Sequence, residues 1–150
     1  ERGLLKGAIG IGALLSDGIG DTVRVSLTDD PVREVAAAKQ ILRAVGIDGQ
    51  RGMDIISCPT CGRTKIDLIP LCRRFEEAIR EEGLEELPLR VALMGCAVSG
   101  PGEAREADIG VAGGIREAVL FRHGEIVEKL PEEEIIPRLI REIKQMGNVT

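Results

Sequence analysis

The chain has 150 residues, which is enough for one ordinary domain or for a small domain together with part of another. Its 20 Lys and Arg residues are interspersed with 25 Asp and Glu residues, and it contains no Trp or Tyr. This charge balance argues against a broad surface for a nucleic-acid backbone, and the missing rings are the platforms on which single-stranded bases stack. We therefore expect no nucleic-acid partner.

The sequence also lacks the patterns that carry proteins into or across membranes. It has no apolar run of about 18 residues, and its first residues do not have the layout of a signal peptide. We expect a cytoplasmic protein with no membrane partner. In such a compartment four cysteines (Cys58, Cys61, Cys72 and Cys96) favour metal ligation or redox chemistry over a disulfide framework.

The first 48 residues predict a helix, a strand and a second helix. Apolar side chains recur at helical spacing between Leu4 and Leu15, although six glycines in the first 20 residues weaken this helix. Residues 21–27 alternate apolar and polar side chains, which is typical of a strand. Pro31 then opens a helix that is expected to end at Gly46. A segment of this length cannot close a sheet, so it needs a partner from elsewhere.

From residue 49 onward the pattern becomes that of a compact α/β unit. The last two expected strands form a hairpin that turns at His123 and Gly124. We expect a small sheet flanked by helices. The expected strands cover residues 53–56, 89–94, 108–112, 118–122 and 125–130, and the expected helices cover residues 66–82 and 131–143.

Two loops of this unit carry cysteines among glycines. Residues 57–64 have the sequence Ser-Cys-Pro-Thr-Cys-Gly-Arg-Thr, and residues 94–103 have the sequence Met-Gly-Cys-Ala-Val-Ser-Gly-Pro-Gly-Glu. Each loop follows an expected strand, which is where α/β sheets gather functional side chains. A Cys-x-x-Cys turn places two sulfurs within reach of one metal centre, and the glycines beside Cys96 let the backbone approach a bulky group. These features favour an iron-sulfur cluster.

Spacing alone leaves three kinds of site open. A zinc-stabilised binding module would need four ligands, and Cys72 would have to be the fourth. Cys72 falls inside the expected helix 66–82, however, where a small buried side chain is the more usual role. A dithiol redox protein would use Cys58 and Cys61 and leave Cys96 without a function. A cluster would use three thiolates from the two loops and a weaker ligand on its fourth iron.

The candidate for the weaker ligand is Glu103, seven residues after Cys96 on the same loop. A carboxylate is a hard ligand in a soft-ligand site, so it is the one that a substrate would displace. An exchangeable ligand would make the cluster a Lewis acid as well as an electron donor. The alternative is that Glu103 is an acid at the N-terminus of a short helix.

Three motifs resemble the C-terminal part of the 4-hydroxy-3-methylbut-2-en-1-yl diphosphate synthase family. The first motif is the cysteine loop at residues 57–64. The second begins with the cysteine loop at residue 94 and continues to residue 110, ending in Glu-Ala-Arg-Glu-Ala-Asp-Ile-Gly. The third is Gly-Ile-Gly-Asp-Thr-Val-Arg-Val-Ser-Leu-Thr at residues 18–28. The resemblance runs along essentially the whole chain. It implies a [4Fe-4S] cluster held by Cys58, Cys61, Cys96 and Glu103, with Glu103 as the catalytic residue that yields its iron to the substrate.

The resemblance also implies the reaction. The family is a reductase of isoprenoid biosynthesis in the methylerythritol phosphate pathway, and its substrate is 2-C-methyl-D-erythritol 2,4-cyclodiphosphate. Two electrons from reduced flavodoxin or ferredoxin open the ring, a C–O bond breaks and water is lost. The product is 4-hydroxy-3-methylbut-2-enyl diphosphate.

By the same resemblance, residues 1–48 correspond to the last segment of a TIM-barrel substrate domain and residues 49–150 to the cluster-binding domain. Arg24 and Ser26 would contact the diphosphate, for which a cation and a hydroxyl are suited, although Arg24 is equally compatible with a solvated strand position. The family forms a homodimer in which the cluster domain of one subunit closes over the barrel of its partner. Because most of the barrel is absent, we expect no turnover from these 150 residues alone.

Two positions depart from the family pattern. The glutamate that supplies a proton in the family lies in a Thr-Glu-Ala-Gly motif upstream of this sequence, so Glu1 does not receive that role. Ser99 stands where the family usually has Asn, and its side chain has a shorter reach.

Overall fold

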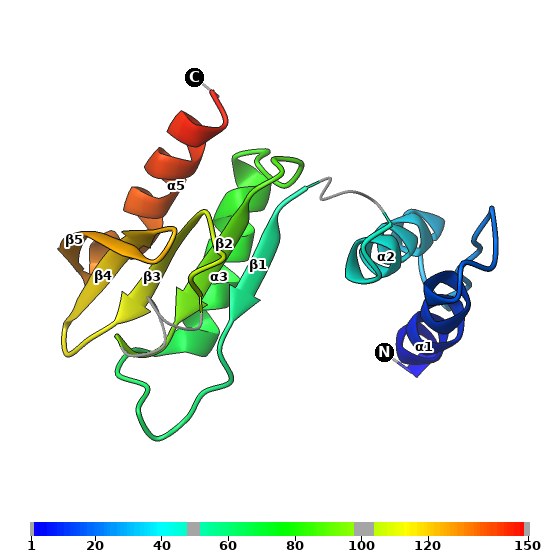
Figure 1. Ribbon diagram of the computed structural model, residues 1–150, viewed down its shortest axis with the longest axis horizontal. Coiled ribbons are helices and arrows are strands. Elements are labelled where there is room, and N and C mark those ends of the chain that lie inside the picture. The colour runs from blue at the N-terminus through cyan, green and yellow to red at the C-terminus, as the bar shows by residue number, and fades with distance from the viewer. Residues whose placement is uncertain (1, 48–51, 98–103, 149–150) are drawn as a thin grey trace. The chain divides into compact units, whose positions relative to one another are not determined.

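The computed structural model describes residues 2–47, 52–97 and 104–148. Its internal contacts divide the chain into two units, Glu1–Arg51 and Gly52–Thr150. Figure 1 shows helices alone in the first unit and a sheet with helices in the second. The α/β fold class expected from the sequence is therefore confirmed.

The N-terminal unit consists of α1 (Arg2–Ser16) and α2 (Pro31–Ala44), and both expected helices are confirmed. The start of α2 is set by its capping residue, because the Asp30 side chain accepts a hydrogen bond of 2.9 Å from the backbone N–H of Val32. Pro31 occupies the first turn, where its missing N–H costs nothing.

The strand expected at residues 21–27 is wrong, because this segment joins α1 to α2 without pairing with a strand. Its alternation is nevertheless visible in the packing. Val25 is buried against Leu15, Ala37 and Ile41, while the side chains on either side of it face solvent. The pattern therefore records which face is buried, but a strand also needs a neighbour to receive its backbone hydrogen bonds.

The C-terminal unit is built on a five-stranded sheet in the described residues, and its strands follow one another in sequence order. The first three strands are parallel, and the last two form an antiparallel meander with the third. Each end of the sheet is an edge strand that pairs with one neighbour only. The strands are β1 (Asp54–Ser57), β2 (Arg90–Met94), β3 (Ile109–Gly113), β4 (Glu117–Arg122) and β5 (Glu125–Pro131).

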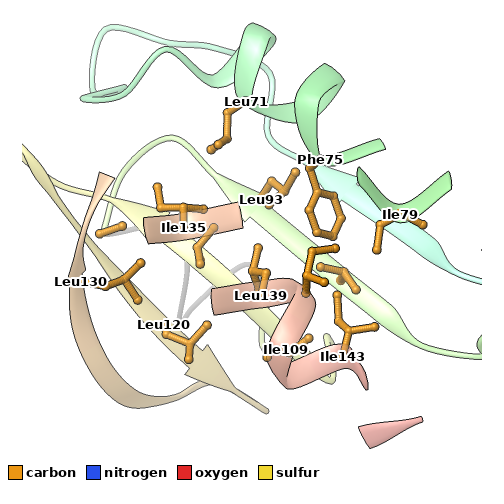
Figure 2. Close-up of a cluster of buried hydrophobic side chains, with 14 of the residues drawn as sticks. Leu71, Phe75, Ile79, Leu93, Ile109, Leu120, Leu130, Ile135, Leu139 and Ile143 are labelled. Atoms are coloured by element: carbon orange, nitrogen blue, oxygen red, sulfur yellow. The ribbon is translucent and has the colours of Figure 1, made fainter. Parts of the chain in front are cut away.

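Two helices, α3 (Leu68–Glu81) and α5 (Ile135–Met146), pack on the same face of this sheet. Figure 2 shows Phe75 of α3 and Leu139 of α5 pointing toward Leu93 and Ile109 of the central strands. Phe75, Leu93, Ile109 and Leu139 are fully buried. This apolar layer fixes the central strands, and the ends of those strands carry the cysteine loops.

The opposite face of the sheet is covered differently. Ala92, Ala112 and Phe121 form a second buried cluster together with Ala104 and Ala107 from the segment before β3. Gly110 makes this tight packing possible, because a Cβ atom there would lie 2.5 Å from the ring of Phe121 and 2.7 Å from the carbonyl oxygen of Ala92. The sheet therefore has no spare space between β2, β3 and β4 at this level.

The remaining expectations need one correction. The hairpin turn at His123 and Gly124 is confirmed, and both residues have positive φ angles of 47° and 81°. Pro131 was expected to open the last helix, but it ends β5, and a short 3-10 helix η1 (Glu132–Glu134) precedes α5. Proline fits both positions because edge strands tolerate a missing N–H donor.

Among the described helices, none is long and apolar enough to cross a membrane.

Candidate metal centre

The register of the sheet brings the two cysteine loops to one edge. β1 and β2 are adjacent and parallel, with Ser57 opposite Leu93. The first cysteine loop (residues 58–67) leaves the end of β1, and the second cysteine loop (from residue 95 onward) leaves the end of β2. Figure 1 shows the arrowheads of both strands at the same end of the sheet. Cys58 and Cys96 are thus placed by neighbouring strands, as the sequence predicts.

The two loops are in direct contact. The backbone N–H of Gly95 donates a hydrogen bond of 3.3 Å to Sγ of Cys58, and the carbonyl oxygen of Gly95 accepts one of 2.8 Å from the backbone N–H of Lys65. Both polar groups of the residue before Cys96 are therefore bound to the first loop. The Cys58 side chain also packs against the apolar clusters on both faces of the sheet.

Thr64, which the sequence did not single out, contacts both cysteine loops. Its Oγ1 atom accepts a hydrogen bond of 3.1 Å from the N–H of Cys61, and its own N–H donates one of 3.0 Å to the carbonyl oxygen of Cys61. Its side chain also fills the space above Gly95, where a Cβ atom would lie 2.8 Å from Cγ2 and 2.9 Å from Oγ1 of Thr64. Thr64 therefore shapes the Cys-x-x-Cys turn and determines how closely the second loop approaches.

The three loop cysteines differ in exposure. Cys61 is exposed, Cys58 is half-buried and Cys96 is buried. Hydrogen bonds from the backbone and the side chain of Arg63, and a further one from Thr64, lower the pKa of Cys61 below its ordinary value. The first loop is thus already arranged to stabilise a thiolate, which is the form that binds iron or zinc.

Cys72 lies on α3, as expected, and is half-buried. It lines a cavity of about 420 Å³ together with Cys58, Pro59 and Ile69. Burial raises the pKa of Cys72 above its ordinary value, and a hydrogen bond with Ser57 offsets part of this effect. Cys72 is therefore a neighbour of the first cysteine loop, but its environment favours the neutral thiol.

These opposite shifts predict a difference in thiol reactivity in protein without a bound metal. Because the pKa of Cys61 is lowered and that of Cys72 is raised, iodoacetamide should alkylate Cys61 faster than Cys72 at neutral pH. As the pH is increased, the alkylation rate of Cys61 should begin to rise at a lower pH than the alkylation rate of Cys72. Peptide mass spectrometry over a pH series measures both rates. Arg63→Ala removes the side-chain donor but keeps the backbone N–H of residue 63, so it should move the Cys61 profile part of the way to higher pH and leave the Cys72 profile in place. A Cys61 profile that does not respond to Arg63→Ala would contradict the contribution assigned to the Arg63 side chain.

The described residues contain no group of three or more Cys, His, Asp or Glu side chains placed to bind one metal ion. Glu103, the expected fourth ligand, and Ser99 lie outside the described residues. A single zinc ion therefore has no preformed site in this part of the chain. The ligands of a cubane bind separate irons, so they do not need to converge on one point.

The two expected substrate residues belong to the N-terminal unit. Ser26 lines a cavity of about 950 Å³ that is also lined by Arg2, Thr28 and Arg33. Arg24 is exposed and is not among the residues that line this cavity. The structure therefore groups Ser26 with two cations that the sequence analysis did not select, and it leaves Arg24 apart from them.

Comparisons with known proteins cover both units. A family model described as the GcpE protein C-terminal domain matches residues 54–145, and one described as the GcpE TIM-barrel domain matches residues 1–39. A relative named 4-hydroxy-3-methylbut-2-en-1-yl diphosphate synthase (flavodoxin) from Caldanaerobacter subterraneus is 56% identical over 146 residues, which are 97% of this chain and 40% of the relative.

Proteins with the same name give similar matches in other bacteria. The one from Clostridium tetani is 52% identical over 97% of this chain and 40% of its own length. The one from Geobacillus kaustophilus is 51% identical over 97% of this chain and 38% of its own length. The chain thus spans about two fifths of the length of these relatives. Since the C-terminal family model alone covers more than half of the 150 residues, the chain belongs to the GcpE family.

Proposed function

We propose that this chain supplies the cluster-binding part of an oxidoreductase that reduces 2-C-methyl-D-erythritol 2,4-cyclodiphosphate to 4-hydroxy-3-methylbut-2-enyl diphosphate. The observation that carries the proposal is the hydrogen bond from the Gly95 N–H to Cys58 Sγ, because it joins the two cysteine loops at one place. The names of the relatives support the reaction. In this proposal residues 49–150 form the cluster domain, and residues 1–48 belong to the substrate barrel.

The proposed ligands are the thiolates of Cys58, Cys61 and Cys96 and the carboxylate of Glu103. Soft sulfur donors suit an iron-sulfur cluster, and the contact between the loops at Gly95 fits a group that is shared by both. When bound, the cluster would supply single electrons and a Lewis-acidic iron. A Lewis-acidic iron needs a ligand that can leave, and Glu103 is the one hard donor in this set.

The surroundings of the thiolates have a role of their own. The Gly95 N–H donates to the Cys58 sulfur, and Arg63 donates to the Cys61 sulfur. Hydrogen bonds of this kind withdraw charge from a sulfur ligand and raise the reduction potential of a cluster. Thr64 holds the Cys61 N–H and limits the position of Gly95, so it would keep these donors aimed at the sulfurs.

On the substrate side, we propose that the diphosphate is bound by Arg24 and Ser26, with Arg2 as a further cation beside Ser26, since Arg33 is already paired with Asp29 at 3.3 Å. The charge of a diphosphate needs several cations, and hydroxyl groups supply additional donors. The overall reaction would take up two electrons, break the ring C–O bond and release water. We further propose reduced flavodoxin or ferredoxin as the electron donor, a homodimer of the full-length protein, and a cytoplasmic location.

The alternative is a zinc-stabilised binding module, and the observation that favours it is the cavity shared by Cys58 and Cys72. In that case Cys72 would replace Glu103 as the fourth ligand. The zinc and cluster proposals make opposite predictions for these two residues, so one experiment separates them.

The test is anaerobic measurement of iron and acid-labile sulfide in the wild type and in four variants. Cys58→Ser and Cys96→Ser are expected to lose nearly all iron and sulfide, because each removes one of three permanent ligands. Glu103→Ala should keep much of the cluster when oxygen is excluded but lose it faster in air. Cys72→Ser is the matched control and should bind as much iron as the wild type. Zinc without sulfide in the wild type, lost in Cys72→Ser, would establish the alternative.

A further inference from the structure

The surface around the first cysteine loop has a charge opposite to that of the chain as a whole. Residues 57–74 contain four cationic side chains and the single acid Asp67, whereas the full chain has a net charge of -5. The four cations (Arg63, Lys65, Arg73 and Arg74) are all exposed. A local excess of cations on an acidic protein attracts an acidic partner to that place.

Several cations elsewhere in the C-terminal unit form ion pairs. Arg90 pairs with Asp54 at 3.0 Å, and Lys129 pairs with Glu117 at 3.2 Å. Lys144 pairs with Glu82 at 2.6 Å, and Arg122 and Arg138 both bind Glu142. Within the described ranges, Lys65 and Arg73 have no such partner. Among the described residues, these two side chains are therefore exposed cations that no ion pair holds.

One of these cations, Arg73, lies at an apolar depression beside the loop. The side chain of Ile69 is 55% exposed, and it lines the cavity of about 420 Å³ together with Pro59, Leu68 and Cys72. Arg73 lines the same cavity. An apolar centre with a charged border is the usual anatomy of a surface that binds another protein. Lys65 does not line the cavity but is exposed on the same loop as Pro59. We call Pro59, Ile69 and Arg73 at the cavity, together with Lys65 on the adjoining loop, the cation-bordered surface.

The position of this surface decides what it would serve. Pro59 belongs to the Cys-x-x-Cys turn itself, and Cys61 in the same turn is exposed to solvent. A protein seated on the cation-bordered surface would therefore contact the turn whose thiolates are proposed to hold the cluster. Such a contact would bring the redox group of the partner close to the exposed Cys61 turn.

We propose that the cation-bordered surface is the docking site for an acidic one-electron carrier protein of the flavodoxin type. This inference rests on the proposed function, which requires an electron donor. In each docking event the carrier would lose one electron and the cluster would gain one, so two events would supply the two electrons of the reaction. The exposure of Lys65 and Arg73 suits the steering of a protein more than the enclosed binding of a small anion.

Two measurements test the proposal. The first is the binding of oxidised flavodoxin to the complete 150-residue chain without metal, at low and high salt. The double variant Lys65→Glu/Arg73→Glu should weaken binding about tenfold at low salt, with a much smaller effect at high salt, because exposed charges are screened. Arg141→Glu is the matched control: Arg141 is exposed on α5, has no ion pair with another described residue, and should bind flavodoxin as the wild type does.

The second measurement is the rate of cluster reduction. The double variant should accept electrons about tenfold more slowly from reduced flavodoxin, and at the wild-type rate from a photoreduced deazaflavin, which is small and uncharged. Unchanged flavodoxin binding in the double variant, or an equal loss in Arg141→Glu, would overturn the docking site. Binding of inorganic diphosphate at this surface with no binding of flavodoxin would overturn it too. If the chain binds no iron and sulfide, the proposed function is refuted. The binding of oxidised flavodoxin to the metal-free chain still tests the docking site in that case.

Discussion

Gly95→Ala is expected to reduce the amount of bound cluster severalfold. A methyl group at residue 95 would lie 2.8 Å from Cγ2 and 2.9 Å from Oγ1 of Thr64, both shorter than any normal contact. Either the backbone of residue 95 must then move, so that its N–H leaves the sulfur of Cys58, or the Thr64 side chain must turn away, so that the Cys61 N–H loses its acceptor. Iron and sulfide content measures the loss. If the backbone moves, the cluster that remains should have a lower reduction potential, because a donor to a sulfur ligand is missing.

A double variant tests whether the contact with Thr64 causes the loss of cluster in Gly95→Ala. Thr64→Ala removes both atoms that obstruct the new methyl group, so Gly95→Ala/Thr64→Ala should bind more cluster than Gly95→Ala alone. Thr64→Ala alone should also lose some cluster, because Cys61 loses the acceptor for its N–H. Gly62→Ala is the control within the same loop, where a Cβ atom would meet nothing within 4 Å. If Gly95→Ala binds as much cluster as Gly62→Ala, the two loops are not positioned by this contact.

Gly110→Ala should have the largest effect on folding. A Cβ atom at residue 110 would lie 2.5 Å from the ring of Phe121, 2.7 Å from the Ala92 carbonyl oxygen and 2.8 Å from the Ala92 Cβ. Two of these atoms belong to the neighbouring strand β2, so relief requires β2 and β3 to separate. We expect a loss of about 3 kcal/mol in the free energy of unfolding, at the upper end for an overpacked core.

Urea unfolding followed by circular dichroism measures this loss, since the chain has no Trp for fluorescence. Phe121→Leu in the Gly110→Ala background should recover only part of it, because the contacts with Ala92 persist. Gly62→Ala again serves as the control. An unfolding midpoint equal to that of the wild type would show that β2 and β3 adjust without cost. Ala92 lies on β2, and Cys96 lies on the loop that leaves the end of this strand. A displacement of β2 should therefore also move Cys96 and lower the cluster content.

The sequence predicts most elements of the C-terminal unit because their patterns are local. Alternating or continuous apolar residues define β2 and β3, and the positive φ angles at His123 and Gly124 follow from a hairpin turn with glycine. The strand predicted at residues 21–27 is wrong for a physical reason. Alternation of apolar and polar residues identifies a buried face, but a strand also needs a neighbour for its backbone hydrogen bonds. The helix start predicted at Pro131 is wrong because proline suits the first turn of a helix and an edge strand equally.

The site is predictable to a smaller extent. Cysteine spacing after two strands correctly predicts that Cys58 and the segment beside Cys96 meet. The role of Thr64 could not be predicted, because it depends on a contact between loops that are about 30 residues apart. The nearness of Cys72 to Cys58 likewise depends on how α3 packs against the sheet. The proposed role of Glu103 stays a prediction.

The place of β1 in the sheet has a consequence for how an inorganic group could enter the protein. β1 has four residues, is only partly buried and, among the described strands, pairs with β2 alone. At the other end of the sheet, β4 and β5 are joined by a longer antiparallel pairing. Detaching the edge strand β1 should cost much less free energy than unfolding the whole C-terminal unit, so we expect local opening of β1 to occur more often than global unfolding. Such an opening would release the sulfur of Cys58 from the Gly95 N–H while the other strands stay paired, which would provide a route for an inorganic group to enter after the unit has folded.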